Sequence, residues 1–462
     1  MAPPTILWFR RDLRLADQAA LVAAAASGPV IPVYILDDET PRHRAMGGAS
    51  RWWLHHSLAR LDESLRARGS RLILRRGKCE DELAKIAEES GAGAVHCLRH
   101  YEPWWRNAER AVAKRLDLRC HDGNYLAPPG SVKTGSGGLY KIYTPFWRAL
   151  RDHMPPPAPL DAPEGLDAPD RWPASDRLDD WRLLPSRPNW ATGFEGEWTP
   201  GETGAQVRLG AFAEIAARYD EQRNLPAIEG SSRLSPHLHF GEVSPAAIWH
   251  AVADAGGSVD VFLAEIGWRD YAQTVILQYP DYGGRSAREA FDTTLPWRSG
   301  KEADADFAAW QQGRTGYPIV DAGMRQLWAT GWMHNRVRMI AASFLIKHLL
   351  IDWRRGEQWF WDTLVDADYA SNAVNWQWVA GSGVDSNMFP RIMAPLTQSE
   401  KFDAAAYIRQ WVPELADIGD AAIHDPDEFG RRPRSYPPKI IGHREARARA
   451  LSAYDVMKAD DN

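Results

Sequence analysis

Residues 5–36 read TILWFRRDLRLADQAALVAAAASGPVIPVYIL and set the fold of the first part of the chain. The apolar run 5–8 predicts a buried strand, the alanine-rich run 17–26 a helix, and the run 29–36 a second strand. The alternation continues through strands at 71–75, 94–98 and near 118, and through helices at 50–68, 80–89 and 103–116. It predicts an α/β domain with a doubly wound, Rossmann-like parallel sheet and ligand space at the carboxyl ends of its strands.

Two local patterns refine this domain. No GxGxxG motif follows the first strand, so a dinucleotide held in the usual way is not expected here. In the segment 50–68, leucines recur at helical spacing, and Ser50 is expected to cap the helix.

The chain changes character after the α/β domain, over residues 151–200. The segment 129–199 contains MPPPAPLDAPEGLDAPDRWPA, lacks periodicity, and is predicted to be an interdomain linker on the surface. The segment 200–462 is predicted to be all-helical, with a loop-rich tail and no strand. Its expected helices cover 207–224, 258–278, 318–330 and 330–353. We therefore expect an α/β domain at 1–128, a linker at 129–199 and a helical domain at 200–462.

Composition narrows the functional classes. The chain has 462 residues, a net charge of −6 and 22 Trp, against 14 Tyr and 13 Phe. An excess of Trp fits stacking on a planar ligand, electron transfer or plain packing. Cys79, Cys97 and Cys120 lack CxxC spacing and are expected to be reduced, as in a cytoplasmic protein. We find no signal peptide, membrane span, metal-ligand spacing, GxSxG or Walker loop, so hydrolysis and nucleoside triphosphate use have no support.

Residues 366–383, DADYASNAVNWQWVAGSG, hold the densest mixture of polar and indole side chains. Such a mixture is poor core material, because buried polar groups need partners. Two interpretations are equally well supported by this segment. The segment is a polar junction between helix and loop with structural Trp residues, or it is one wall of a ligand site.

Two further windows allow a ligand as well as a simpler explanation. GSSRLSPHLHFGE, residues 230–242, offers hydroxyl and backbone N–H groups for an anion, or is a capped helix start with an exposed Arg. Glu265 and Arg269 are four residues apart on a helix and form either an ordinary ion pair or, with Trp268, a set suited to a base-shaped ligand.

Two other windows carry aromatic side chains. In TGWMHNRVRM, residues 330–339, Trp332, Asn335 and Met339 are expected on one stripe, while His334 is a lone imidazole and predicts no metal. Trp104 and Trp105 open the helix at 103–116 and either clamp a flat ring or cover the edge of the sheet.

Six long motifs follow one another in a specific order. They are WFRRDLRL, YDEQRNLPAIEGSSRLSPHLHFGE, EIGWRDY, GRTGYPIVDAGMRQLWATGWMHNRVRMIAASFLIKHLLIDW, DADYASNAVNWQWVAGSG and FPRIMAPLTQSEKFD. Together they resemble the photolyase–cryptochrome family along essentially the whole chain. The resemblance implies an N-terminal α/β domain with an antenna pigment and a helical domain that binds FAD and DNA.

The resemblance also implies roles for individual residues. The matching FAD contacts are Tyr219, Ser231, Ser232, Arg233, Leu234, Ser235, Arg269, Trp332, Asn335, Arg338, Asp366, Asp368 and Asn372. Asn372 matches the residue that faces flavin N5. Trp376, Trp353 and Trp297 match a chain of Trp residues that passes electrons to the flavin, although the spacing after Trp297 departs from several relatives.

The lesion and DNA positions follow in the same way. Glu265, Trp268, Met339 and Trp378 match the lesion pocket of photolyases that act on cyclobutane pyrimidine dimers. Arg223, Arg336 and Arg391 match phosphate-binding positions. The catalytic set implied by the resemblance is Glu265, Asn372, Trp376, Trp353, Trp297 and Met339.

The implied function is repair of cyclobutane pyrimidine dimers in DNA, driven by light. In this interpretation photoexcited reduced FAD gives an electron to a flipped-out dimer, which is a deoxyribodipyrimidine photo-lyase activity. Asn372 favours a photolyase, since plant cryptochromes tend to carry Asp there, and NRVRM lacks the His found in pyrimidine–pyrimidone photolyases. A blue-light photoreceptor of the cryptochrome type, without repair, is the alternative.

The antenna and the assembly complete the expectations. Arg51, Glu102, Trp104 and Trp105 lie where an antenna pocket is expected. Glu102 and the adjacent indoles suit a pterin, which favours methenyltetrahydrofolate, while a deazaflavin or a flavin stays open. The resemblance implies a monomer that binds damaged DNA and no membrane.

Overall fold

The computed structural model describes residues 2–40, 44–257 and 259–460. The chain divides into two compact units, which are treated separately. Unit 1 comprises Met1–Ala217, Ser232–Pro280 and Val365–Ala367, and unit 2 comprises Arg218–Ser231, Asp281–Leu364 and Asp368–Asn462. The boundaries after residues 128 and 199 rest on sequence pattern and stay a prediction.

A five-stranded parallel sheet forms the centre of the N-terminal part of unit 1. Its strands are β1 (Thr5–Phe9), β2 (Val30–Leu36), β3 (Ile73–Arg76), β4 (Ala94–Leu98) and β5 (Leu118–His121). Their order in the sheet is β3-β2-β1-β4-β5, and each neighbouring pair is parallel. The order reverses between β1 and β4, as in a doubly wound fold, so the predicted fold class is confirmed.

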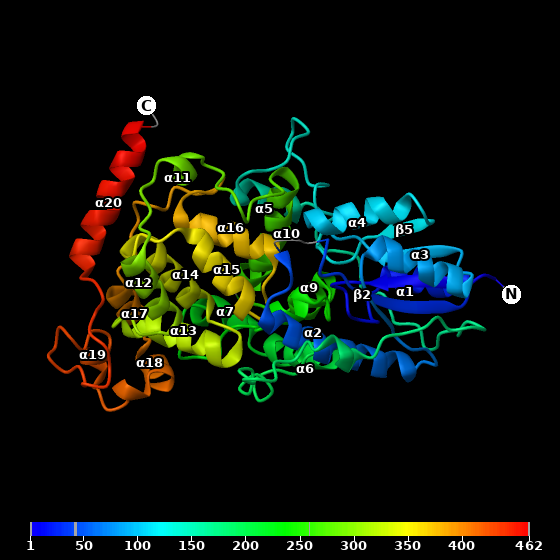
Figure 1. Cartoon of the computed structure of the whole chain (residues 1–462), viewed down its shortest axis with the longest axis horizontal. Coiled ribbons are helices and arrows are strands. Elements are labelled where there is room, and N and C mark those ends of the chain that lie inside the picture. Colours follow the sequence, from blue (N-terminus) through cyan, green and yellow to red (C-terminus); the bar gives the residue numbers. More distant parts are fainter. Residues whose placement is uncertain (1, 41–43, 258, 461–462) are drawn as a thin grey trace. The chain divides into compact units, whose positions relative to one another are not determined.

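Helices cover both faces of this sheet (Figure 1). The helices are α1 (Ala19–Ser27), α2 (Gly48–Arg66), α3 (Cys79–Ser90) and α4 (Pro103–Ala113). Side chains of α3 and α4 join Trp8, Val95 and Cys97 in one buried cluster on one face. Helix α1 packs against β1 and β4 without joining that cluster, and so covers the other face. The fully buried β1 and β2 are typical of such a parallel sheet.

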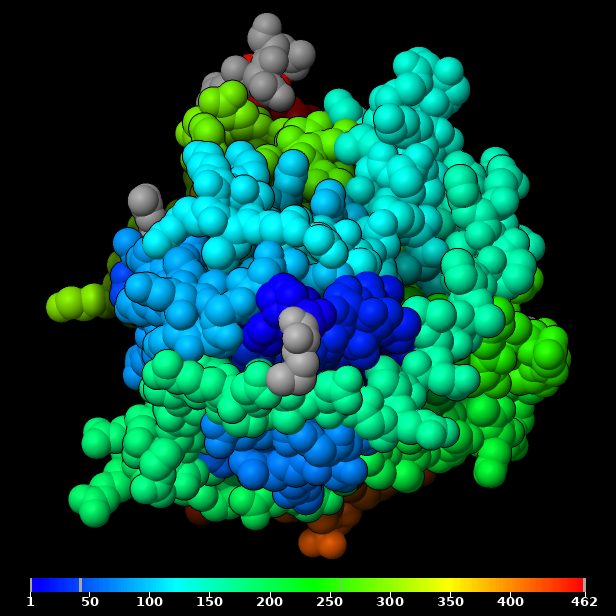
Figure 2. All heavy atoms as spheres, turned by 90° about the vertical axis from the view of Figure 1, so that its right-hand side faces the viewer, coloured from blue at the N-terminus to red at the C-terminus, as the bar shows by residue number. Residues whose placement is uncertain are grey.

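Part of the segment 129–199 is hydrogen-bonded to the α/β layers. It contains α5 (Tyr143–Arg151) and a 3₁₀ turn at Leu178–Trp181. Its backbone N–H groups at Leu166 and Asp176 donate to carbonyls of Arg68 and Leu74 at 2.9 and 2.8 Å. Figure 2 shows this segment as a teal-green band across the surface of the α/β layers. Main-chain hydrogen bonds therefore hold the segment beside the edge strand β3.

The remaining elements of unit 1 are helical. They are α6 (Glu202–Ala213), α8 (Ser235–His239), α9 (Pro245–Val252) and α10 (Val259–Gln278). The expectation of one helix over 207–224 is wrong, because α6 ends at Ala213 and a 3₁₀ turn at Ala216–Arg218 precedes α7 (Tyr219–Gln222). The expected helix at 258–278 is confirmed from Val259; residue 258 lies outside the described residues.

The described part of unit 2 consists of helices and loops, without a strand. Its main helices are α12 (Lys301–Gln311), α13 (Pro318–Thr330), α14 (Asn335–Ser343), α15 (Trp353–Thr363), α16 (Tyr369–Ala380), α17 (Pro395–Lys401), α18 (Ala405–Trp411) and α20 (His443–Asp460). The predicted absence of strands from residue 200 onward holds for the residues that the structure describes.

Three further expectations about helices are wrong. The run 330–353 is not one helix, because Gly331 ends α13 at a φ of +69° and the chain re-enters helix only at Asn335. A π-helical turn at Phe344–His348 then ends the segment. Helix α2 begins at Gly48 with Gly47 as its N-cap, so Ser50 is not the cap.

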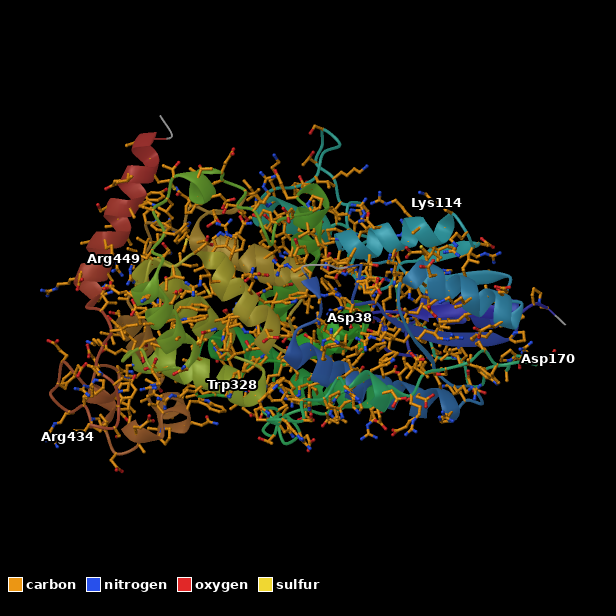
Figure 3. All side chains as sticks on the ribbon, viewed as in Figure 1. Asp38, Lys114, Asp170, Trp328, Arg434 and Arg449 are labelled. Carbon is orange, nitrogen blue, oxygen red and sulfur yellow. The ribbon has the colours of Figure 1, made fainter. Side chains whose placement is uncertain are left out.

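The third correction concerns the tail, which contains an 18-residue helix, α20. Arg449 on α20 (Figure 3) donates to the carbonyl of His348 at 2.5 Å. A hydrogen bond of 2.8 Å connects the Nε2 of His348 with the Nδ1 of His443. Tyr454 stacks on Phe389 at 5.1 Å. The high charge and proline content of the region suggested loops, but these contacts supply the packing that stabilises a helix.

Candidate functional site

Helix α16 carries most of the stretch 366–383. Its N-cap is Asp368, whose carboxylate accepts from the N–H of Ser371 at 2.7 Å, and Gly381 ends it at a φ of +79°. Asp366 precedes the helix and is buried. Asp366 and Asp368 therefore belong to different local structures, since Asp368 caps a helix of unit 2 and Asp366 lies in unit 1.

The side-chain amide of Asn372 has a fixed orientation. Its Nδ2 donates to the backbone carbonyl of Glu357 at 3.1 Å and to its Oε1 at 2.9 Å. Glu357 lies on α15 and is fully buried. Because both N–H groups of the Asn372 amide donate to Glu357, only its Oδ1 remains to bond another group, and it does so as an acceptor. Sequence reasoning missed Glu357, whose role follows only from the packing of α15 against α16.

The serine-rich loop before α8 is held by its own hydroxyl groups. Ser235 donates to the Asp366 carboxylate at 2.6 Å, and the Oγ of Ser232 accepts from the N–H of Leu234 at 3.3 Å. Arg233 stands in the left-handed region at a φ of +51° and pairs with Glu197. The loop thus brings Ser235 and Asp366 together in unit 1 and directs the Arg233 guanidinium to Glu197.

Three guanidinium groups surround a neutral imidazole at the start of α14. The Nδ1 of His334 accepts from the N–H of Arg336 at 3.2 Å and caps the helix. Burial, together with the positive charges of Arg338, Arg336 and Arg223, lowers the pKa of His334 to about 4. The uncharged ring leaves the positive charge of this helix start with the arginines, which suits an anion.

Neighbouring groups hold these arginines in place. Arg336 donates to the Oδ1 of Asn224 at 2.7 and 3.2 Å, and Arg338 donates to the carbonyl of Met333 at 2.7 Å. The guanidinium of Arg223 lies 5.3 Å from the ring of Tyr219. Trp332 is not on the stripe with Asn335 and Met339, because its backbone lies outside the helix. The ring of Trp332 is buried, 5.9 Å from the Arg338 guanidinium.

The expected chain of Trp residues is embedded in unit 2. Trp376 and Trp353 are buried, and Trp297 is half-buried. The indole N–H of Trp353 donates to Ser286 at 3.1 Å, and that of Trp297 donates to the carbonyl of Phe291 at 2.8 Å. Trp376 packs against Phe360 with ring centroids 5.0 Å apart. Hydrogen bonds thus hold two of the indoles and ring packing holds the third, and their role as an electron path stays a prediction.

Helix α10 presents the expected lesion residues of unit 1. Trp268 stacks on Tyr143 with centroids 3.7 Å apart and an angle of 12° between the rings. The Tyr143 hydroxyl donates to the carbonyl of Ala264 at 2.5 Å. Burial, with the charges of Glu265 and Asp270, raises the pKa of Tyr143, so it stays a neutral donor. Sequence reasoning missed Tyr143, which lies in the segment expected to be a linker.

The side chain of Arg269 contacts the loop after β5. Its guanidinium donates to the carbonyl of Asn124 and lies 4.5 Å from the ring of Tyr125. Asp270 next to it is buried, accepts from the N–H groups of Leu126 and Ala127, and has a pKa that burial raises to about 7. Both side chains therefore fasten α10 to the loop after β5.

The remaining lesion and phosphate positions lie in unit 2. Met339 and Trp378 are half-buried, and Arg391 is exposed. Lys347 donates to the carbonyls of Met388 and Arg391 at 2.8 and 3.1 Å, and burial lowers its pKa to about 7. The loop that carries Arg391 is therefore anchored by a buried amine that the sequence did not single out.

The expected antenna residues have separate surroundings in unit 1. Arg51 pairs with Asp38 at 2.5 Å and donates to the carbonyl of Met46 at 3.0 Å. Glu102 is the buried N-cap residue of α4. Trp104 and Trp105 are both half-buried, and the ring centroid of Trp105 lies 6.4 Å from that of Trp8 in the sheet. Of the two indoles, Trp105 belongs with the packed layer over the sheet.

Comparisons with known proteins agree along the chain. Residues 5–164 match the family model described as DNA photolyase, and residues 262–456 match the FAD binding domain of DNA photolyase. The chain is 48% identical to a deoxyribodipyrimidine photo-lyase of Agrobacterium fabrum, covering 98% of both chains. It is 35% identical to cryptochrome-1 of Arabidopsis thaliana, covering 98% of this chain and 70% of that one.

A solved structure adds the same likeness in three dimensions. The crystal structure of a bacterial class III photolyase from Agrobacterium tumefaciens superposes with a TM-score of 0.94 at 47% identity, covering 99% of this chain and 98% of that one. Among the helices that the structure describes, none is long and apolar enough to cross a membrane.

Proposed function

The chain belongs to the DNA photolyase family and carries its FAD-binding domain, and on that premise we propose that it is a deoxyribodipyrimidine photo-lyase that repairs cyclobutane pyrimidine dimers with light. When bound and reduced, FAD supplies an electron to a flipped-out dimer under blue light. The observation that carries the substrate assignment is α10, where Glu265 lies one turn from a Trp268 ring held flat against Tyr143. A fixed aromatic face beside a carboxyl group suits a pair of pyrimidines, which present a flat surface and ring N–H groups.

The residues present fit FAD by their chemistry. The diphosphate of FAD is an anion, and the start of α14 offers a helix N-terminus with Arg338 nearby and a neutral His334. The hydroxyl and backbone N–H groups of residues 231–235 also suit an anion, because they donate hydrogen bonds. The FAD-binding set is Tyr219, Ser231, Ser232, Arg233, Leu234, Ser235, Arg269, Trp332, Asn335, Arg338, Asp366, Asp368 and Asn372.

Asn372 is assigned to flavin N5 in this proposal. Its Nδ2 donates to Glu357, so the atom of Asn372 that is left for the flavin is Oδ1, a hydrogen-bond acceptor. An uncharged acceptor tolerates a negative charge nearby, whereas a carboxylate repels it. Asn372 therefore influences the protonation state of the flavin without adding a charge of its own.

The lesion is held by four side chains, in the proposal. Trp268 and Trp378 stack on the pyrimidines, Met339 packs against them, and Glu265 hydrogen-bonds a ring N–H group. Arg223, Arg336 and Arg391 contact phosphates, which fix the position of the strand and make binding depend on salt.

Trp376, Trp353 and Trp297 are proposed to carry electrons inward to the cofactor. Replacing Trp376 by Phe keeps the packing of the ring but removes the easily oxidised indole. Reduction of bound flavin under blue light with an external donor should then fall at least tenfold. Undiminished photoreduction in the Trp376→Phe protein would remove this residue from the path.

The antenna is proposed to be methenyltetrahydrofolate. A half-buried Trp104 and a buried Glu102 at the start of α4 are the observations in its favour, and a deazaflavin or flavin is the alternative. Absorption and mass spectra of pigment released from the purified protein distinguish the three.

The second candidate function is a photoreceptor of the cryptochrome type, supported by the likeness to cryptochrome-1. The deciding experiment illuminates the FAD-loaded protein with dimer-containing DNA and measures loss of the dimer. We expect blue light to restore the pyrimidines and Glu265→Ala to lower the yield per absorbed photon several-fold. No dimer loss from a protein that binds and reduces flavin normally would reject repair and favour the photoreceptor.

A further inference from the structure

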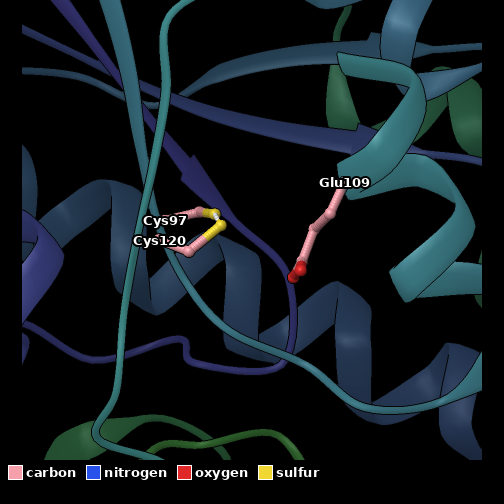
Figure 4. Close-up of side chains that lie close together, drawn as sticks. All are labelled: Cys97, Glu109 and Cys120. Carbon is pink, nitrogen blue, oxygen red and sulfur yellow. Dashed lines mark hydrogen bonds between the residues drawn. The ribbon is translucent and has the colours of Figure 1, made fainter. Parts of the chain in front are cut away.

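Two cysteine side chains meet at an edge of the sheet in unit 1 (Figure 4). Cys97 on β4 and Cys120 on β5 are register partners, and their sulfur atoms are 3.7 Å apart. Neighbouring strands lie about 4.8 Å apart, which is a backbone separation that a disulfide spans. We propose that Cys97 and Cys120 form a redox-active pair that a hydroperoxide converts into a disulfide.

The two thiols differ in access. Strand β5 is the outer strand of the sheet, and Cys120 on it is half-buried, whereas Cys97 on the inner neighbour β4 is fully buried. The exposed Arg99 follows β4, and its positive charge interacts with the sulfur of Cys120. Cys120 is thus the sulfur that a small oxidant meets first, and Cys97 is placed to react with it afterwards.

The charges around Cys120 favour its thiolate. The hydrogen bond from the Cys97 thiol, together with the positive charges of Arg10 and Arg99, lowers the pKa of Cys120 to about 7. The pKa of Cys97 is raised by its hydrogen bond with Cys120 and by burial, and burial raises that of Cys79. Since the thiolate is the nucleophile, only Cys120 among the three is activated at neutral pH.

One molecule of hydrogen peroxide is sufficient to form the disulfide. The Cys120 thiolate attacks one oxygen of the peroxide, forms a sulfenic acid and releases hydroxide, which takes up a proton to become water. The sulfur of Cys97 then attacks the sulfenic sulfur, loses its proton and displaces a second water. Two thiols are oxidised, one peroxide is reduced to two waters, and one disulfide forms.

Glu109 would complete a set of three metal ligands with these cysteines, since the ligand atoms lie within 4.8 Å of one another. The guanidinium of Arg10, however, is fully buried and donates to the Glu109 carboxylate at 2.8 Å. A buried cation in this position repels a divalent ion and stabilises a thiolate. The same group therefore argues for an oxidisable pair over a metal site.

The test treats the FAD-loaded full-length protein in the dark with one equivalent of hydrogen peroxide. We expect two of its three thiols to disappear, peptide mapping to find the Cys97–Cys120 disulfide, and dithiothreitol to restore both thiols. Cys79 should remain reduced and serves as the internal reference. The rate should be half-maximal near pH 7, where Cys120 ionises.

Single variants separate the two roles. Cys97→Ser should stop the reaction at a Cys120 sulfenic acid that dimedone traps, and Cys120→Ser should slow oxidation of Cys97 at least tenfold. Arg99→Gln should slow the first step several-fold while leaving the melting temperature unchanged, because Arg99 is exposed. Equal oxidation of all three cysteines, oxidation of Cys97 at an unchanged rate in Cys120→Ser, or a metal bound by the purified protein through Cys97 and Cys120 would overturn the proposal.

Discussion

At the scale of single residues, the site depends on which donors and acceptors are bonded within the protein and which remain for a ligand. The amide of Asn372 has both N–H groups on Glu357, so only its acceptor faces outward. His334 is neutral among arginines, and Tyr143 is a neutral donor whose ring supports Trp268. The states of Asn372 and Tyr143 follow from neighbours farther along the chain, whereas that of His334 follows from burial and from arginines both near and far in sequence.

The substitution Asn372→Asp tests the first of these states. A carboxylate there would lie about 3 Å from that of Glu357, so the two would share a proton or repel, and negative charge on reduced flavin would be disfavoured. We expect spectra of the reduced protein to shift toward protonated flavin, with repair lowered at least tenfold. Asn375→Asp is the matched control, because Asn375 is exposed on the same helix. Identical spectra for both variants would contradict the role of Asn372.

The support of Trp268 by Tyr143 gives a second prediction. Tyr143→Leu removes the stacked ring, whereas Tyr143→Phe keeps it and loses only the hydrogen bond to Ala264. A stacked aromatic pair contributes about 0.5–1.5 kcal/mol, so Tyr143→Leu should weaken binding of dimer-containing DNA roughly two- to twelvefold. Titration with labelled DNA measures this, and Tyr143→Phe should bind nearly as the parent does. Equal weakening in both variants would assign the effect to the hydroxyl instead.

At the scale of elements, close helix packing positions the buried indole. Helices α15 and α16 pack so tightly at Gly356 that a Cβ there would lie 2.2 Å from Cη2 of Trp376. The same glycine faces Leu345 of the π-helical turn, at 2.5 Å from its Cδ2. The absence of a side chain at one helical position therefore determines where Trp376 lies.

Gly356→Ala should consequently destabilise unit 2. Overpacking costs about 1–3 kcal/mol, which outweighs the gain of about 1 kcal/mol from placing Ala in a helix. Gly210→Ala in α6 is the control, since nothing lies within 4 Å of its Cβ position and only the helical gain applies. Denaturant midpoints should fall for the first variant and rise or stay for the second. A rise in both would show that Trp376 moves without cost.

At the scale of the whole molecule, buried neutral imidazoles link stability to acid. The pKa of His334 in the folded chain is about 4, against 6.5 for an exposed His. Between these values the unfolded chain binds more protons than the folded one, so stability falls as the pH drops from about 6.5 to about 4 and is unaffected above that range. His348, with a pKa of about 3 because it is buried, acts in the same direction.

His334→Asn isolates the contribution of His334. Asn retains an acceptor for the helix cap but does not titrate. We expect its loss of unfolding free energy between pH 6.5 and 4 to be smaller than that of the parent by up to about 3 kcal/mol. Denaturation at a series of pH values measures the difference. Parallel curves for the two proteins would mean that His334 is charged in the folded state.

The sequence by itself determined the α/β domain, the helical character of the second half and the family, because local periodicity and long ordered motifs carry this information. It misplaced the helix at 330–353, since one left-handed glycine decided the break, and it missed α20, whose stability comes from contacts with His348 and Phe389. Only the tertiary structure joined Cys97 to Cys120, Asn372 to Glu357 and Trp268 to Tyr143. Such pairs depend on the register of strands and the packing of helices, which residues far apart in the chain set together.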